Sequence, residues 1–121
     1  MFFSKKEKPK ALEITDANFN EVAMDTPKGI LLDFYADWCG PCKVLSPIID
    51  ELAGDFKDRV LIGKVNVDKN PNLSAHFKVK SMPTLIFIKN KQVLEVLNGL
   101  VPKPNLEEML EDLEKYVFEE E

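Results

Sequence analysis

Cys39 and Cys42 are the only cysteines of the chain, and Gly40 and Pro41 separate them. Two thiols at this spacing can close and open a disulfide with each other, which is the chemistry of dithiol–disulfide exchange. The pair follows an apolar run at residues 30–36 and precedes a helical pattern, so we expect both thiols at the start of a helix. Unpaired N–H groups and the helix dipole stabilise a thiolate there. We therefore expect Cys39, nearer the helix start and solvent, to be the nucleophile, and Cys42, one turn inside and less accessible, to resolve a mixed disulfide.

Three other roles for the cysteine pair stay open from the residue types alone. A structural zinc site usually takes four ligands from Cys and His. His76 is the only histidine, so carboxylates or a second chain would have to complete such a site. A structural disulfide closing so short a loop would remove little unfolded-chain entropy and stabilise weakly, and the third alternative is two inert thiols. We predict no metal site, and we interpret His76 as a surface helix residue.

Asp33 is the only charged residue in the apolar run at residues 30–36. A carboxyl group buried there would have its pKa raised by desolvation, which would suit it to accept a proton. The alternative is a strand whose other face meets water at that point. Lys64 alternates with apolar neighbours, so a plain solvent-facing strand position also stays open for it.

Secondary-structure elements must position the cysteine pair and Asp33. The hydrophobic pattern predicts alternating strands and helices. We expect strands at residues 12–14, 30–36, 60–67, 84–88 and 92–97. We expect helices capped by Thr15 and Asp16 and ending near Met24, at 41–56, and from Asn70 with Pro71 at its first position. A final helix carries the apolar stripe Leu106, Met109, Leu110, Leu113 and Val117. Such alternation predicts an α/β fold, a three-layer sandwich with helices on both faces of the sheet.

Length and charge limit the functional classes. The 121 residues fit one domain, which we place at residues 11–118, between a flexible leader at 1–10 and an acidic end at 119–121. The net charge of −5 argues against nucleic-acid binding, because phosphate contacts need clustered Lys and Arg. No apolar run approaches the length of a membrane span, and from the first residues we expect no secretory signal. In a reducing compartment, a close cysteine pair favours catalysis or metal binding over a structural role.

Residues 32–43 (LDFYADWCGPCK) resemble the active-site segment of the thioredoxin family. About forty residues on, Met82-Pro83-Thr84 is similar to that family's cis-proline loop, and residues 64–68 resemble its third strand. The resemblance runs from Ala11 to Tyr116. It implies the thioredoxin fold, with a central mixed sheet of five strands and four flanking helices.

The resemblance also implies roles for particular residues. Cys39 would attack, Cys42 would resolve, Asp33 would be a buried carboxyl that handles the Cys42 proton, and Lys64 would lie near Asp33. Pro83 would be cis, and the backbone of the residue before it would pair with an extended substrate. The implied docking surface consists of Trp38, Gly40, Pro41, Met82, Asn98 and Gly99.

The implied activity is that of a general protein-disulfide reductase in cell redox homeostasis. The resemblance implies that electrons come from NADPH through a flavoprotein thioredoxin reductase. The chain shows no cofactor motif, so we expect no bound cofactor, and we expect a cytoplasmic monomer. Two alternatives remain: a thiol oxidant or isomerase, and a non-catalytic binding module with the same fold. Lys91 stands where the family commonly has glycine, in a turn that we expect near the partner surface, and Tyr35 stands where many members have tryptophan.

Overall fold

The central strand β2 (Gly29–Tyr35) forms from the apolar run that contains Asp33, and six of its seven residues are buried. In the computed structural model, which describes residues 8–118, this strand pairs in parallel with β3 and antiparallel with β4. The five-stranded sheet has the order β1-β3-β2-β4-β5 and is mixed, as expected. The other strands are β1 (Leu12–Glu13), β3 (Val60–Asn66), β4 (Thr84–Lys89) and β5 (Gln92–Asn98).

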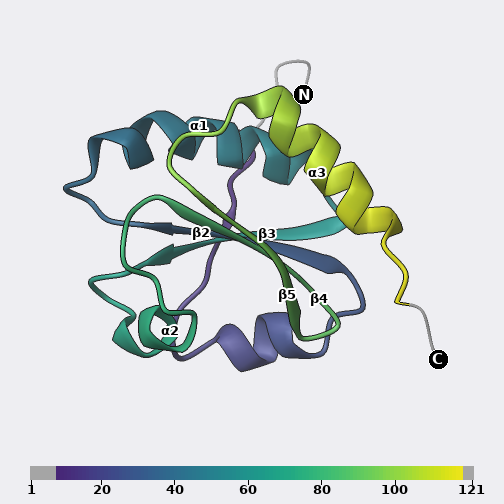
Figure 1. The fold of residues 1–121 in the computed structure, drawn as a ribbon, viewed down its shortest axis with the longest axis horizontal. Helices are drawn as coiled ribbons and strands as arrows, with labels where there is room; N and C mark the ends of the chain where they lie inside the picture. Colours follow the sequence, from purple (N-terminus) through teal and green to yellow (C-terminus); the bar gives the residue numbers. More distant parts are fainter. Residues whose placement is uncertain (1–7, 119–121) are drawn as a thin grey trace, which may run out of the picture.

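Helices cover both faces of the sheet (Figure 1). Helices α1 (Gly40–Asp55) and α3 (Lys103–Lys115) lie on one face, and α2 (Pro71–His76) with the short π-helix η1 (Asn20–Met24) lies on the other. The predicted three-layer α/β/α sandwich with four flanking helices is therefore confirmed for the described residues.

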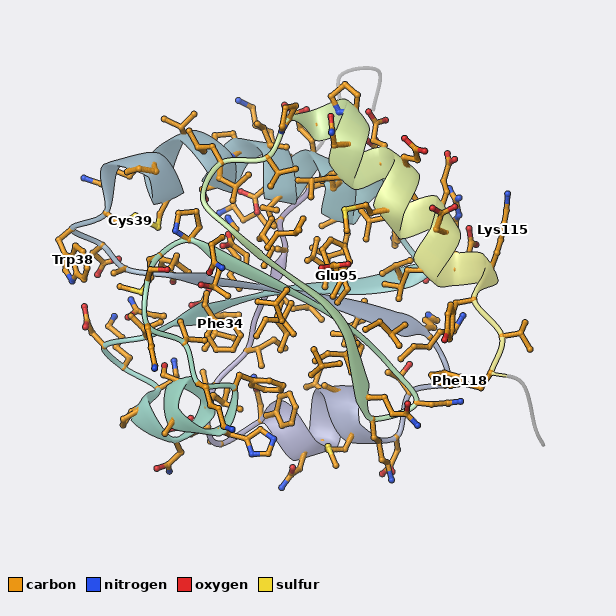
Figure 2. The ribbon with its side chains drawn as sticks, viewed as in Figure 1. Phe34, Trp38, Cys39, Glu95, Lys115 and Phe118 are labelled. Carbon is orange, nitrogen blue, oxygen red and sulfur yellow. A yellow bond between two sulfur atoms is a disulfide. The ribbon has the colours of Figure 1, made fainter. Side chains whose placement is uncertain are left out.

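Alternation along β2 divides the core between the two faces. Leu31 belongs to the cluster under α1 and α3, whereas Leu32 and Phe34 belong to the cluster under η1 and α2. Phe34 is fully buried in the interior of the molecule (Figure 2). Its ring centroid lies 5.7 Å from that of Phe77. Because side chains alternate along a strand, Asp33 must share the face of Leu31, which is the face covered by α1.

The helix caps near the first helix differ from the prediction. The Thr15 hydroxyl does accept the Asn18 N–H, but the regular helix starts only at Asn20. The Asp16 carboxylate instead accepts the N–H groups of Asn72 and Leu73, so it caps α2. Asn70, which we expected to cap α2, makes no such bond; its amide binds the Asp16 N–H and a β3 carbonyl. Sequence spacing could not reveal this cap, because its two partners are more than 50 residues apart.

The final helix is shorter than the apolar stripe suggested. Leu106, Leu110 and Leu113 are buried as expected, but α3 ends at Lys115. Tyr116 takes an extended conformation (φ −63°, ψ 129°), which turns the chain away from the helix. Val117 is consequently 79% exposed, so its assignment to the stripe was wrong.

The β4–β5 turn lies away from the surface where we expected it. Thr84, next to Pro83, pairs with Asn98 at one end of the hairpin, whereas Lys89 pairs with Gln92 at the other. Lys91 therefore lies at the end of the hairpin opposite to Pro83, and the expectation that its charge lies near the partner surface was wrong.

The predicted end segments lie largely outside the described residues. Residues 1–7 of the leader at 1–10 and the acidic end at 119–121 are not among them. Of the leader residues that are described, Pro9 lies against helix α1 at Gly54. Within residues 8–118, no helix has the length and apolar character needed to cross a membrane.

Candidate active site

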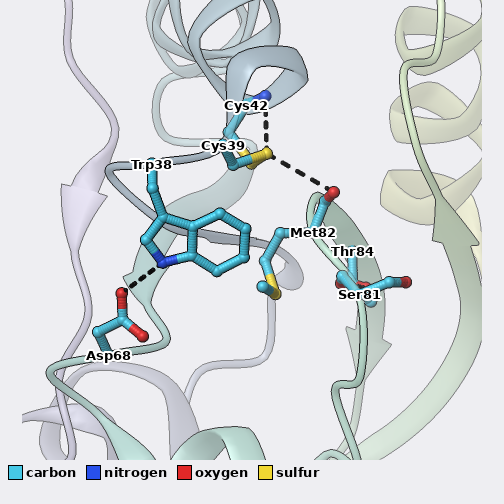
Figure 3. Close-up of a disulfide and its surroundings, with 7 residues drawn as sticks. All are labelled: Trp38, Cys39, Cys42, Asp68, Ser81, Met82 and Thr84. Carbon is cyan, nitrogen blue, oxygen red and sulfur yellow. Dashed lines mark hydrogen bonds between the residues drawn. A yellow bond between two sulfur atoms is a disulfide. The ribbon is translucent and has the colours of Figure 1, made fainter.

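Cys39 and Cys42 form a disulfide across the first turn of α1, with their Cα atoms 5.3 Å apart. The chain leaves β2 after Tyr35 and reaches the N-cap of α1 at Cys39, which has an extended backbone. Pro41 stands in the first turn, where its missing N–H is not needed. The Cys39 Sγ accepts a hydrogen bond from the Cys42 N–H at 3.2 Å (Figure 3).

This hydrogen bond shows that the N-terminus of α1 donates to the sulfur of Cys39. A helix start presents free N–H groups and the positive end of the dipole, and both favour a negatively charged acceptor. When the disulfide is open, the same N–H can stabilise a Cys39 thiolate, which is the reactive form in disulfide exchange.

Solvent exposure does not separate the two cysteines. Cys39 is 5% exposed and Cys42 is 3% exposed, so both are buried in the disulfide form and the expected difference in accessibility is small. Both pack in a small cluster with Ala36, and Met82 lies against it. The position of each sulfur relative to the helix start, and not its exposure, distinguishes them.

The loop before β4 meets the disulfide. The Met82–Pro83 peptide bond is cis, as the resemblance implied. The Met82 carbonyl oxygen lies 3.6 Å from the Cys39 Sγ, so this loop and the helix start face each other across the sulfur (Figure 3). Pro83 itself is buried and Met82 is half-buried.

Trp38 lies beside the disulfide and is 68% exposed. Its indole N–H donates to the Asp68 carboxylate at 3.0 Å, and this bond fixes the ring from the end of β3 (Figure 3). Gly40 and Pro41 are also exposed. A large aromatic side chain that is held in place yet left bare is typical of a contact surface.

Asn98 and Gly99 complete the predicted surface from the end of β5. The Gly99 N–H donates to the Pro83 carbonyl at 2.9 Å, and its φ of +87° is readily adopted only by glycine. The Thr84 hydroxyl lies 3.0 Å from the Asn98 amide oxygen. The structure thus brings the docking residues predicted from sequence into contact with the Met82–Pro83 loop or the helix start. Figure 2 shows Trp38 and Cys39 together at one end of the molecule, and Lys115 and Phe118 at the other.

Asp33 is 1% exposed, so the alternative of a water-facing strand position is wrong. Neither carboxyl oxygen has a hydrogen-bond partner among residues 8–118. Desolvation raises the pKa of Asp33 from 3.8 to about 7; Lys64 opposes this rise, and the charges of Asp50 and Glu13 add to it. Such a carboxyl group can both accept and return a proton near neutral pH.

Lys64 lies next to Asp33, because the two residues are paired in the β2–β3 register. Its side chain is only 12% exposed, so the solvent-facing alternative is wrong here as well. The ammonium does not pair with Asp33. It makes an ion pair with Asp50 Oδ1 at 2.9 Å and donates to the Ser46 hydroxyl, both on α1.

Sequence reasoning did not single out Ser46, Asp50 or the Asp68 contact. A pattern for the first two was present, because residues 42, 46 and 50 are four apart and share one face of the helix. Nothing in the sequence marked Asp68 as the partner of an indole thirty residues away.

That the chain holds no metal site stays a prediction. Both sulfurs are bonded to each other, and among residues 8–118 no group of three or more His, Cys, Asp or Glu side chains converges on a point. His76 is exposed at the end of α2.

Comparisons with known proteins agree with this geometry. The family model described as Thioredoxin matches residues 10–112. A thioredoxin from Haemophilus influenzae is 48% identical over 97 residues, which cover 80% of this chain and 91% of the relative. Thioredoxins from Staphylococcus haemolyticus (44%, covering 83% of this chain and 94% of the relative) and Chlorobaculum thiosulfatiphilum (43%, covering 78% and 87%) are also similar. With the disulfide at the start of α1 and the cis-proline loop against it, the chain belongs to the thioredoxin family, whose members are thiol–disulfide oxidoreductases that reduce protein disulfides.

Proposed function

We propose that Cys39 is the attacking residue of a general protein-disulfide reductase. Its thiolate attacks one sulfur of a substrate disulfide, so that a Cys39–substrate bond forms as the substrate S–S bond breaks. The second substrate sulfur leaves as a thiolate and takes a proton from solvent. The hydrogen bond from the Cys42 N–H supports this assignment, because it reaches the Cys39 sulfur and can stabilise a thiolate there once the disulfide is open.

Cys42 then resolves the mixed disulfide. Its thiol proton passes to the Asp33 carboxylate, and the Cys42 thiolate attacks the Cys39 sulfur. The Cys39–Cys42 bond forms, the bond to the substrate breaks, and the substrate leaves reduced by two electrons while this chain is oxidised. A pKa of about 7 supports Asp33 in this role, because the group then exchanges protons at neutral pH.

Substrates dock as extended chains over the cis-proline loop. The Met82 carbonyl already faces Cys39, and an extended segment that pairs with this backbone would present its disulfide to the sulfur. Trp38, Gly40 and Pro41 supply one wall of the surface, and Asn98 and Gly99 supply the other. Such backbone pairing tolerates many side chains, which suits a general reductase.

The oxidised chain must be reduced again for each turnover. A flavoprotein thioredoxin reductase that uses NADPH is the partner implied by the family, and this chain supplies only the dithiol. The protein works as a monomer with disulfide-containing proteins as substrates, and in the cytoplasm, where a reducing pool keeps the dithiol form available.

The observation that carries the proposal is the Cys42 N–H bond to the Cys39 sulfur, and replacing Cys42 by serine tests it. Without Cys42 the mixed disulfide cannot be resolved, so Cys42→Ser should accumulate a covalent complex with a disulfide substrate, visible on a non-reducing gel. Cys39→Ser is the matched control and should form no such complex. Accumulation with Cys39→Ser and not with Cys42→Ser would reverse the two roles.

A further inference from the structure

Asp33 and Lys64 present an unusual arrangement for two buried neighbours of opposite charge. They lie side by side in the β2–β3 register, yet both Asp33 oxygens lack a hydrogen-bond partner among the described residues. A buried charged group is normally paired, because leaving it alone costs free energy. The cation that could pair with this carboxyl group is present but turned elsewhere.

Helix α1 holds that cation. The Lys64 ammonium contacts Asp50 Oδ1 at 2.9 Å and the Ser46 hydroxyl, one helical turn apart. Asp50 Oδ1 also accepts the Ala11 N–H at 2.9 Å, so the carboxylate is fixed from the segment before β1. We call these two α1 residues, Ser46 and Asp50, the lysine clamp.

The clamp lies on the helix that carries the disulfide. Cys42, Ser46 and Asp50 follow one another at four-residue spacing, so they share the helix face that meets the sheet near Asp33. The charged groups that act on Asp33 come from three elements: Lys64 from β3, Asp50 from α1 and Glu13 from β1. Glu13 is in turn hydrogen-bonded by the Tyr35 hydroxyl at 2.7 Å, which holds its charge outside the clamp.

We propose that Ser46 and Asp50 are positioning residues which hold the Lys64 ammonium against α1, so that the Asp33 carboxyl stays without a cationic partner and free to exchange a proton with Cys42. This inference rests on the proposed role of Asp33. If the clamp were opened, the ammonium would move toward the carboxyl group, and a close opposite charge would favour the ionised form. Asp33 would then become a weaker base at neutral pH, and resolution by Cys42 would slow.

The test follows the titration of Asp33 by carboxyl-carbon NMR in the oxidised protein, in which neither cysteine titrates. Ser46→Ala combined with Asp50→Asn opens the clamp, and the same pair of changes is made in a Lys64→Met background. Removing the Asp50 charge lowers the pKa of Asp33 directly in both backgrounds. We expect an additional fall of about 1 unit only where Lys64 is present.

Ser46→Ala alone should give a smaller fall in the same direction, again only with Lys64 present, and it keeps the helix intact because alanine is a good helix former. Ser74→Ala, which removes a hydroxyl from α2 far from Asp33, is the matched control and should leave the titration unchanged. Equal shifts in the two Lys64 backgrounds, or no shift for the opened clamp, would overturn the proposal.

The rate of mixed-disulfide resolution separates this proposal from the proposed function. If the clamp variants shift the Asp33 titration and move the pH midpoint of resolution with it, both proposals hold. If the titration shifts but the Asp33→Asn variant resolves the mixed disulfide as fast as the unchanged protein, the clamp proposal holds and the proposed catalytic role of Asp33 is wrong.

Discussion

Asp33 is a buried carboxyl group without a hydrogen-bond partner among the described residues, and this placement has an energetic consequence. The sheet forces its carboxyl group into the layer under α1, where water is excluded and the neighbouring ammonium is held by the helix. The unfolded chain ionises the same group freely. Folding therefore disfavours the ionised form of Asp33. As a result, the free energy of unfolding should depend on pH.

Stability should fall as the pH rises through the range where Asp33 titrates. Its pKa is raised from 3.8 to about 7, so between these values the native protein holds a proton that the unfolded chain has released. The native state then binds more protons, and the free energy of unfolding decreases with pH. We expect a loss of about 2 to 3 kcal/mol from this group between about pH 5 and pH 8, measured by urea unfolding of the oxidised protein.

Asp33→Asn separates this contribution from every other titrating group. The amide keeps the shape of the carboxyl group and does not titrate. The loss of stability that Asp33 causes between about pH 5 and pH 8 should therefore disappear. The same variant should reduce disulfide substrates more slowly near neutral pH, because Cys42 loses its proton acceptor. An identical pH dependence in the variant would mean that Asp33 ionises normally in the native protein.

At the residue scale, the sequence singled out Asp33 and the cysteine pair, whose catalytic roles stay predictions, but it did not predict the contacts around them. Asp33 stood out because a lone charge in an apolar run is rare, and the cysteine pair stood out through its spacing. The ion pair of Lys64 with Asp50 could not be predicted, because register alone places Lys64 beside Asp33 and only the packing of α1 turns its ammonium away.

The β4–β5 hairpin shows how an element can keep its geometry with an unfavourable residue. Asn90 and Lys91 form a two-residue turn with φ values of 51° and 63°. Both angles lie in the left-handed region, which matches the twist of a hairpin and which favours Asn and Gly at these positions. Asn90 fits, whereas the Lys91 side chain makes its backbone conformation costly.

Replacing Lys91 by glycine should therefore stabilise the protein. Glycine adopts a positive φ without steric cost, and the ion pair lost with Asp25 is long (3.9 Å) and exposed. We expect Lys91→Gly to raise the free energy of unfolding by about 1 kcal/mol in urea unfolding experiments. Lys91→Ala removes the same charge but keeps a Cβ, so it should bring no gain; equal effects of the two variants would argue against backbone strain.

Elements were predictable where the pattern was long and local. The strands and α1 lie within one or two residues of their expected bounds, because apolar runs and a helical stripe are read directly from the sequence. The start of the first helix and the cap of α2 were not predictable in this way, because Asp16 caps α2, which follows it by more than 50 residues.

At the scale of the whole molecule, the fold gathers short segments from four places in the chain at one end of the sheet. The start of α1, the end of β3, the loop before β4 and the end of β5 meet around Cys39. Composition and periodicity predicted the sandwich, but only the resemblance predicted that these segments meet. Long-range proximity depends on strand order, which local patterns do not encode.

The direction of electron flow is a property of the whole molecule, since it depends on how the fold stabilises the dithiol relative to the disulfide. The reduction potential of the Cys39–Cys42 pair measures this balance, by equilibration with a thiol–disulfide buffer and alkylation of the free thiols. A protein-disulfide reductase of this family should give a value near the roughly −270 mV that is general for thioredoxins. A value near about −120 mV, typical of a strong thiol oxidant, would contradict the proposed reductase function and reverse the direction of exchange.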